Sequence, residues 1–179
     1  MSKPIAELLD DNRLIIWDIK QARELYNNGF YGKPLGDPRP SADFEDPLLL
    51  DPVEAQYLAE QDIIRIHRDN TYIDKKKLRN ILENNFIEFD KKYRVYKDLR
   101  SRGYVVTPGI KYGSDFAVYE DGPGIDHAPY IVQIIDSEEQ LSAAEIVKAG
   151  RLATTVRKSF ILAVVDEKIR YLEFNWWKA

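Results

Sequence analysis

The stretch GIKYGSDFAVYEDGPGIDHAPYIV at residues 109–132 reads as two short apolar strands separated by a loop rich in turn-forming residues. It holds one of the chain's two histidines, His127, and Tyr112 lies just before the first strand. A hairpin can bring two such residues close together. They are then either ordinary surface polar residues or two members of a proton-transfer group.

The segments around this hairpin continue the pattern of a sheet. Apolar runs that are typical of strands recur at 104–109, 130–136, 160–166 and 169–177. Residues 142–159 predict one helix between them, because Ser142 and Glu145 form a Ser-x-x-Glu capping box at its start. The C-terminal half is therefore predicted to be a mixed sheet with one packed helix.

The N-terminal half combines short strands with helices. Asp51 as N-cap and Pro52 at the first helical position predict the start of a helix, and Asp69-Asn70 predicts the turn of a small strand pair. The proline-rich residues 33–47 are expected to form a loop or linker with no packed element of their own. Further strands and helices are expected at 12–18, 19–32, 74–86 and 86–103.

These patterns together define the fold class. We predict a mixed α/β chain, of the α+β type, in two domains. A small N-terminal α/β domain should span residues 1–87, and a C-terminal domain with a mixed sheet and one packed helix should span residues 88–179.

Composition limits the class of protein. With 179 residues, 44% of them hydrophobic and 31% charged, the chain can bury a core of its own. The N-terminus lacks the apolar segment of a signal peptide, and no apolar run approaches the roughly 20 residues of a membrane span, so we expect a cytoplasmic protein. The absence of cysteine excludes disulfides, thiolate metal sites and cysteine nucleophiles.

Charge is unevenly distributed along the chain. The net charge of −4 argues weakly against a nucleic-acid-binding protein, but the predicted helix at 86–103 is rich in cations. These cations are Lys91, Lys92, Arg94, Lys97, Arg100 and Arg102. They form either a solvated helix face or a surface that steers phosphate groups.

Three residues could supply the chemistry of metal-free RNA cleavage. Such a reaction needs a base for the ribose 2′-hydroxyl, an acid for the leaving 5′-oxygen and a cation for the phosphorane. Tyr112, His127 and Lys158 offer these residue types, and Lys158 connects the predicted helix to an apolar strand. Each also has a more ordinary interpretation, as a sheet-edge aromatic, a loop histidine and a cation at a helix C-terminus. Spacing alone leaves both interpretations open.

Three segments carry a resemblance to a known family. They are YRVYKDLRSRGYVVTPGIKYGSDFAVYE at 93–120, HAPYIVQI at 127–134 and RLATTVRKSFILAVVD at 151–166. Together they resemble the catalytic domain of the archaeal tRNA-splicing endonuclease. NRLIIWD, GFYGKP and LDPVEAQYLAEQ in the N-terminal half resemble the smaller domain of that family.

The resemblance implies roles for individual residues. The family's base falls on Tyr112 of Lys-Tyr-Gly, its acid on His127 and its lysine on Lys158 of Val-Arg-Lys. Arg151 stands where the family has an arginine that grips a flipped base of the RNA bulge, and Trp177 or its neighbour Trp176 could supply a stacking surface. No metal and no cofactor are implied.

The resemblance also implies a substrate and an assembly. The expected enzyme excises introns from precursor tRNA at bulge-helix-bulge sites and leaves a 2′,3′-cyclic phosphate and a 5′-hydroxyl. In one group of family members an acidic loop docks into a basic pocket of a partner subunit, and Asp136, Glu138 and Glu139 (hereafter the acidic loop) match it. The resemblance implies a homotetramer, a dimer of dimers, although some family members build the tetramer from two different subunits. The apolar final strand with its two adjacent tryptophans is expected to pair with its copy across a dimer.

Two other interpretations stay open. A metal-dependent nuclease of the restriction type would use Asp115 together with Asp166 and Lys168, an Asp-x-Lys pattern. A non-catalytic RNA-binding subunit would use none of the three catalytic candidates. Cleavage in the presence of EDTA separates the first interpretation from the metal-free one.

Overall fold

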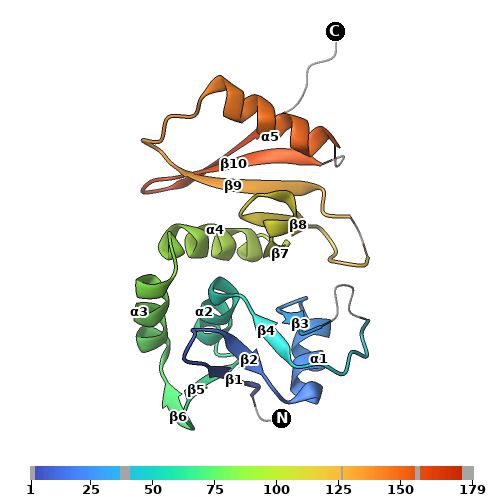
Figure 1. Cartoon of the computed structure of the whole chain (residues 1–179), viewed down its shortest axis with the longest axis vertical. Helices are drawn as coiled ribbons and strands as arrows, with labels where there is room; N and C mark the ends of the chain where they lie inside the picture. Colours follow the sequence, from blue (N-terminus) through green and yellow to red (C-terminus); the bar gives the residue numbers. More distant parts are fainter. Residues whose placement is uncertain (1–2, 37–40, 126, 156–157, 175–179) are drawn as a thin grey trace. The chain divides into compact units, whose positions relative to one another are not determined.

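The computed structural model describes residues 3–36, 41–125, 127–155 and 158–174 (Figure 1). Contacts divide the chain into two compact units, Met1–Tyr93 and Arg94–Ala179. Each unit contains its own mixed sheet and at least one helix. The predicted fold class, mixed α/β with an N-terminal and a C-terminal part, is confirmed.

The N-terminal unit is built on a six-stranded sheet with the order β3-β4-β2-β1-β5-β6. Its strands are β1 (Ile5–Leu8), β2 (Leu14–Ile16), β3 (Lys33–Pro34), β4 (Leu48–Leu50), β5 (Arg65–Arg68) and β6 (Thr71–Ile73). The helices α1 (Ile19–Asn27), α2 (Pro52–Glu60) and α3 (Lys75–Asn85) belong to the same unit, and α4 (Phe89–Ser101) runs from it into the next.

Local sequence signals explain several of these elements. The Asp51 carboxylate accepts the Val53 N–H at the start of α2, and Glu54 completes a capping box with it. Asp69 and Asn70 both have positive φ angles, of 50° and 59°, as a two-residue hairpin turn between β5 and β6 requires. Both predictions are confirmed.

Three strands of this sheet, β1, β3 and β4, were not predicted. Lys33 and Pro34 form β3, which pairs with Leu49 and Leu48, so the stretch 33–47 does begin with a packed element. Proline is tolerated there because β3 is an edge strand. The four residues of β1 were not predicted, since they pair in parallel with the distant β5 rather than in a local hairpin.

The C-terminal unit is built on a five-stranded sheet with the order β11-β10-β9-β8-β7. Its elements are β7 (Val105–Pro108), the short 3₁₀ helix η1 (Ile110–Tyr112), β8 (Phe116–Tyr119), β9 (Tyr130–Asp136), α5 (Ala143–Thr155), β10 (Ser159–Val165) and β11 (Ile169–Phe174). The pair of β9 and β10 is parallel, and every other neighbouring pair is antiparallel. A parallel pair requires a crossover connection, and α5 provides it.

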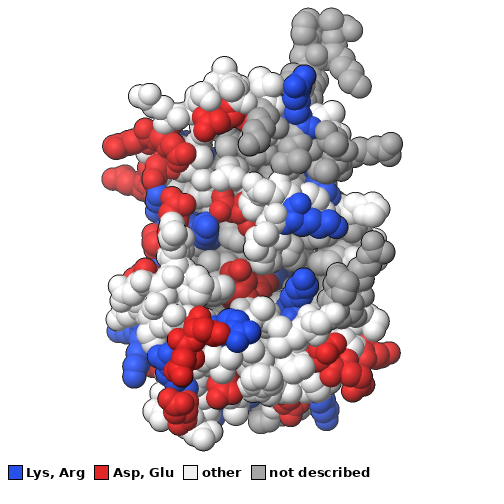
Figure 2. Space-filling model, viewed as in Figure 1, with Lys and Arg blue, Asp and Glu red and all other residues white. Residues whose placement is uncertain are grey.

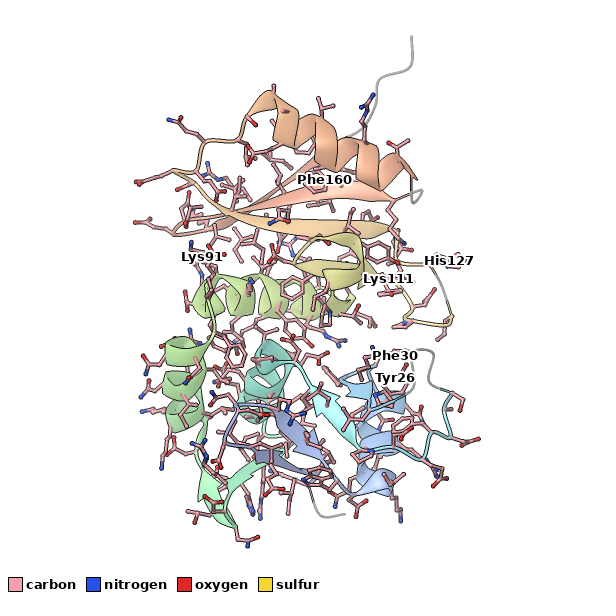
Figure 3. All side chains as sticks on the ribbon, in the orientation of Figure 1. Tyr26, Phe30, Lys91, Lys111, His127 and Phe160 are labelled. Atoms are coloured by element: carbon pink, nitrogen blue, oxygen red, sulfur yellow. The ribbon has the colours of Figure 1, made fainter. Side chains whose placement is uncertain are left out.

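The packing of α5 on the sheet forms one part of the core of this unit. Buried side chains of β9 and β10, among them Ile131, Ile135 and Phe160, form one cluster with Ala149 of α5 packed against it. Figure 3 shows Phe160 between α5 and the sheet. The helix begins as predicted, because Ser142 and Glu145 exchange backbone-to-side-chain hydrogen bonds in a capping box. Burying this cluster fixes the relative positions of β9, β10 and the loops at their ends.

No helix among the described residues is long and apolar enough to span a membrane.

Candidate active site

Tyr112 is held at the end of η1, in the connection between β7 and β8. The Gly109 N–H donates to the Asp115 carbonyl at 2.8 Å, which closes a small loop, and the Tyr112 N–H donates back to the Gly109 carbonyl at 2.8 Å. Gly113 follows with a φ of 64°, a left-handed conformation that ends η1 at the tyrosine. The tyrosine ring is partly buried against the core cluster of the sheet.

The turn that carries Tyr112 leaves no room for a side chain at its first residue. A Cβ atom on Gly109 would lie 2.5 Å from Ser114 Oγ and 2.8 Å from backbone atoms of Phe116. These distances are far below normal contact, so glycine is required by close packing here. The glycine of the Pro-Gly pair at 108–109 therefore positions η1.

Asp115 ties this turn to the sheet. Its N–H donates to the Val132 carbonyl at 3.1 Å, and its carboxylate Oδ2 accepts the Ile134 N–H at 2.8 Å. A buried or partly buried backbone donor on β9 is thereby satisfied by a charged acceptor, which is a strong form of hydrogen bond. Asp115 thus helps to hold the η1 segment in one place.

Lys158 meets Tyr112 at the start of β10. Its ammonium lies 5.1 Å from the centroid of the Tyr112 ring and donates a hydrogen bond to the Ala128 carbonyl, one residue after His127. The parallel register sets Ser159 opposite Tyr130, and the Ser159 N–H donates to the Pro129 carbonyl at 2.8 Å. The structure therefore brings Lys158 against Tyr112 and against the peptide that follows His127.

His127 itself lies exposed in the β8–β9 loop. Figure 3 shows it at the same end of the C-terminal sheet as Lys111, the residue before Tyr112. Because its neighbour Ala128 is hydrogen-bonded to Lys158, the histidine is anchored through the backbone while its imidazole faces solvent. The exposed imidazole is accessible to a substrate bound at this end of the sheet.

Lys111 is a residue of this region that the sequence did not single out. Its ammonium lies 6.0 Å from the centroid of the Tyr112 ring, and its side chain is exposed. The tyrosine ring is therefore within reach of two ammonium groups, those of Lys111 and Lys158. The only signal in the sequence is its position directly before Tyr112.

The three residues of the restriction-type metal site considered above, Asp115, Asp166 and Lys168, do not lie together in the structure. Asp115 lies beside Val132 and Ile134. Asp166 follows Val165, which is paired with Asp136 at the other end of β9. The Asp166 carboxylate accepts the Lys168 N–H at 2.7 Å, so these two residues form the predicted turn between β10 and β11. Among the described residues, no three side chains of the metal-binding types lie together.

The acidic loop lies at the opposite end of β9 from His127. Its three members line a hollow of about 490 Å³ with Ser137, Val165 and Asp166. Figure 2 shows acidic side chains gathered at this end of the C-terminal unit. The seven residues of β9 span roughly 20 Å, so the acidic loop is too far away to take part in its own chain's site.

The other predicted contact residues are less informative. Arg151 is exposed on α5 and Trp177 lies outside the described residues. Arg94 of α4 donates to the Asp166 carbonyl at 2.7 Å, and Arg102, just after α4, pairs with the Asp98 carboxylate at 2.9 Å. These intrachain bonds occupy two of the six cations between residues 91 and 102, which favours a structural role for these two over phosphate steering.

Comparisons with known proteins agree with the resemblance over almost the whole chain. A model of the N-terminal domain of the tRNA intron endonucleases matches residues 5–79, and a model of their catalytic C-terminal domain matches residues 89–171. A tRNA-splicing endonuclease of Hyperthermus butylicus is 45% identical over 171 residues, which cover 93% of this chain and 94% of that protein. A tRNA-splicing endonuclease of Sulfolobus acidocaldarius is 42% identical over 177 residues, 96% of this chain and 97% of that protein. The predicted family is thereby confirmed, and the chain belongs to the tRNA intron endonucleases.

Proposed function

We propose that the chain is an endoribonuclease that excises introns from precursor tRNA at bulge-helix-bulge sites. The observation that carries this proposal is the position of Lys158, which contacts the Tyr112 ring and the peptide after His127 at once. This contact supports the proposal that Tyr112, His127 and Lys158 act together on one phosphodiester. Family membership supports the substrate class.

The proposed reaction is a transesterification without a metal. The Tyr112 side chain, acting as a phenolate, accepts the proton of the ribose 2′-hydroxyl, and the 2′-oxygen forms a bond to phosphorus. The bond to the 5′-oxygen breaks, and His127 gives that oxygen its proton. Lys158 stabilises the negative charge that builds on the phosphoryl oxygens, since its own position is fixed by the Ala128 carbonyl. The products are a 2′,3′-cyclic phosphate and a 5′-hydroxyl.

The base-gripping role of Arg151 and the stacking role of Trp177 belong to the same proposal. A guanidinium plane stacks well on an unpaired base, and the exposure of Arg151 on α5 is compatible with that contact. The cytoplasmic location expected from the sequence stays a prediction.

We further propose a homotetramer in which the acidic loop joins two dimers. Its distance from the site of its own chain supports a role toward another subunit. The edge strand β11 exposes Leu172 by 51%, which supports pairing of this strand across a dimer.

One experiment tests the reaction. Purified protein alone should cut an intron-containing precursor tRNA in the presence of EDTA, and the products should carry cyclic phosphate and 5′-hydroxyl ends. A substrate with a 2′-deoxynucleotide at the scissile position should resist cleavage, because it lacks the nucleophile. Normal cleavage of the deoxy substrate, or loss of activity in EDTA, would contradict the mechanism.

A further inference from the structure

We propose that Lys111 binds a phosphate of the RNA substrate next to the catalytic group. This inference rests on the proposed function, because it assigns a new substrate contact to the same site. No role for this lysine follows from the predicted roles of Tyr112, His127 and Lys158.

The position of Lys111 is the first part of the argument. It lies on η1 directly before Tyr112, and its ammonium is 6.0 Å from the centroid of the tyrosine ring. The hydrogen bonds of Gly109 and Asp115 fix η1, so the lysine starts from a rigid base although its side chain is free to swing. Figure 3 shows Lys111 and His127 at the same end of the C-terminal sheet.

The second part is the difference between the two lysines at the tyrosine ring. Lys158 is partly buried and donates to the Ala128 carbonyl, so it is suited to one fixed phosphoryl oxygen. Lys111 is exposed, and within the described part of the chain no carboxylate forms an ion pair with it. A flexible, solvated ammonium is well suited to a neighbouring phosphate that arrives with the substrate.

The third part is the charge of the whole chain. With a net charge of −4, the protein as a whole repels RNA, so attraction has to come from local cations near the site. Arg94 of α4 and Arg102, just after α4, are occupied by bonds within the C-terminal unit. Lys111 offers its charge beside the proposed base and on the exposed side of η1, where Ile110 is 83% exposed.

A phosphate contact of this kind makes a distinct prediction for binding. Each phosphate neutralised on a single strand contributes about 0.7 to the slope of log K against log salt. Lys111→Met should therefore weaken binding of a bulged RNA roughly three- to tenfold at low salt and reduce that slope by about 0.7. Lys111→Arg should retain most of the affinity. Lys168→Met, at an exposed lysine in the turn at the far end of the sheet, is the matched control and should bind like the wild type.

The test uses the full chain and a bulged RNA with a 2′-deoxynucleotide at the scissile position, titrated over a series of KCl concentrations. Cleavage of the all-ribose RNA is measured in parallel, and Lys111→Met should raise KM while kcat changes by less than about threefold, as expected for ground-state binding. Unchanged affinity and salt slope would overturn the inference, as would a loss confined to kcat. If the wild type cleaves the RNA in EDTA, the proposed function stands whatever the Lys111 variants show. If the wild type neither binds nor cuts the RNA, the proposed function and the role of Lys111 are both wrong.

Discussion

Replacing Gly109 with alanine should test how Tyr112 is positioned. The new Cβ would lie 2.5 Å from Ser114 Oγ and 2.8 Å from backbone atoms of Phe116. The serine hydroxyl can rotate away, but the backbone of β8 cannot move without disturbing its pairing with β9. The start of η1 must therefore shift instead. Overpacking of this kind costs about 1–3 kcal/mol of stability.

The effect on activity should exceed the effect on stability. Tyr112 donates its N–H to the Gly109 carbonyl, so a displaced Gly109 moves the proposed base with it. A misplacement of about 1 Å lowers the rate of an enzymatic step by roughly a hundredfold. We therefore expect kcat to fall between tenfold and a hundredfold while KM for precursor tRNA changes little, because binding depends mainly on other contacts.

Single-turnover cleavage and urea unfolding measure the two effects separately. The control is Gly103→Ala, where a φ of 94° strains any side chain but no atom lies within 4 Å of the new Cβ. This variant should lose a similar amount of stability, of about 1–3 kcal/mol, yet keep its single-turnover rate. If Gly109→Ala folds stably and cleaves at the wild-type rate, or if both variants lose activity equally, then this turn does not position the tyrosine.

Three further predictions concern the proposed acid, the assembly and an internal hydrogen bond. His127→Ala should slow cleavage by roughly 10²–10⁴-fold with RNA binding almost intact. A substrate with a 5′-phosphorothiolate leaving group, which departs without a proton, should restore much of the cleavage rate of His127→Ala but not the rate of Tyr112→Phe. Exchanging all three members of the acidic loop for lysine should give inactive dimers in light scattering, and a fully active tetramer would remove the loop from the assembly. The Tyr171 hydroxyl donates to the Asp98 carboxylate at 2.7 Å, and burial together with this bond raises the pKa of Tyr171. The protonated hydroxyl therefore stabilises the fold below the usual tyrosine pKa of about 10, and this stabilisation is lost as the pH rises further. In urea unfolding, Tyr171→Phe should be about 1.5 kcal/mol less stable than the wild type near neutrality. Between about pH 9 and 11 the variant should lose less stability than the wild type does.

The elements that sequence predicted well are those with local signals. The α5 capping box depends on Ser142 and Glu145 alone, and the β5–β6 turn depends on Asp69 and Asn70. The strand β1 has only four residues, and its partner residues in β5 lie sixty positions away in the chain, as in the pair of Ile5 and Arg65. No local pattern encodes such a pairing, so it emerged only from the structure.

In the candidate site, too, the sequence predicted the residue types but not the contacts that depend on the folded chain. The residue types of Tyr112, His127 and Lys158 were evident from the sequence and the resemblance, but the contacts among their segments were not. Lys111 was missed because an exposed lysine has no signature of its own in a sequence. Asp115 was considered as a metal ligand, whereas its carboxylate accepts the Ile134 N–H. Only the folded hairpin shows that Asp115 accepts a backbone hydrogen bond and that Lys111 lies beside the Tyr112 ring.

The parallel pairing of β9 with β10 is the step that assembles the site. Its register sets Tyr130 opposite Ser159, so the residues just before each strand, His127 to Pro129 on one side and Lys158 on the other, meet at one end of the sheet. Side chains alternate between the two faces of a strand, so a slip of one residue would turn the buried face of β10, including Phe160 and Leu162, toward the opposite side. The core cluster under α5 therefore penalises any other register. The same apolar contacts that stabilise the domain therefore also bring Lys158 to the Ala128 carbonyl and position a site that is built on two loops.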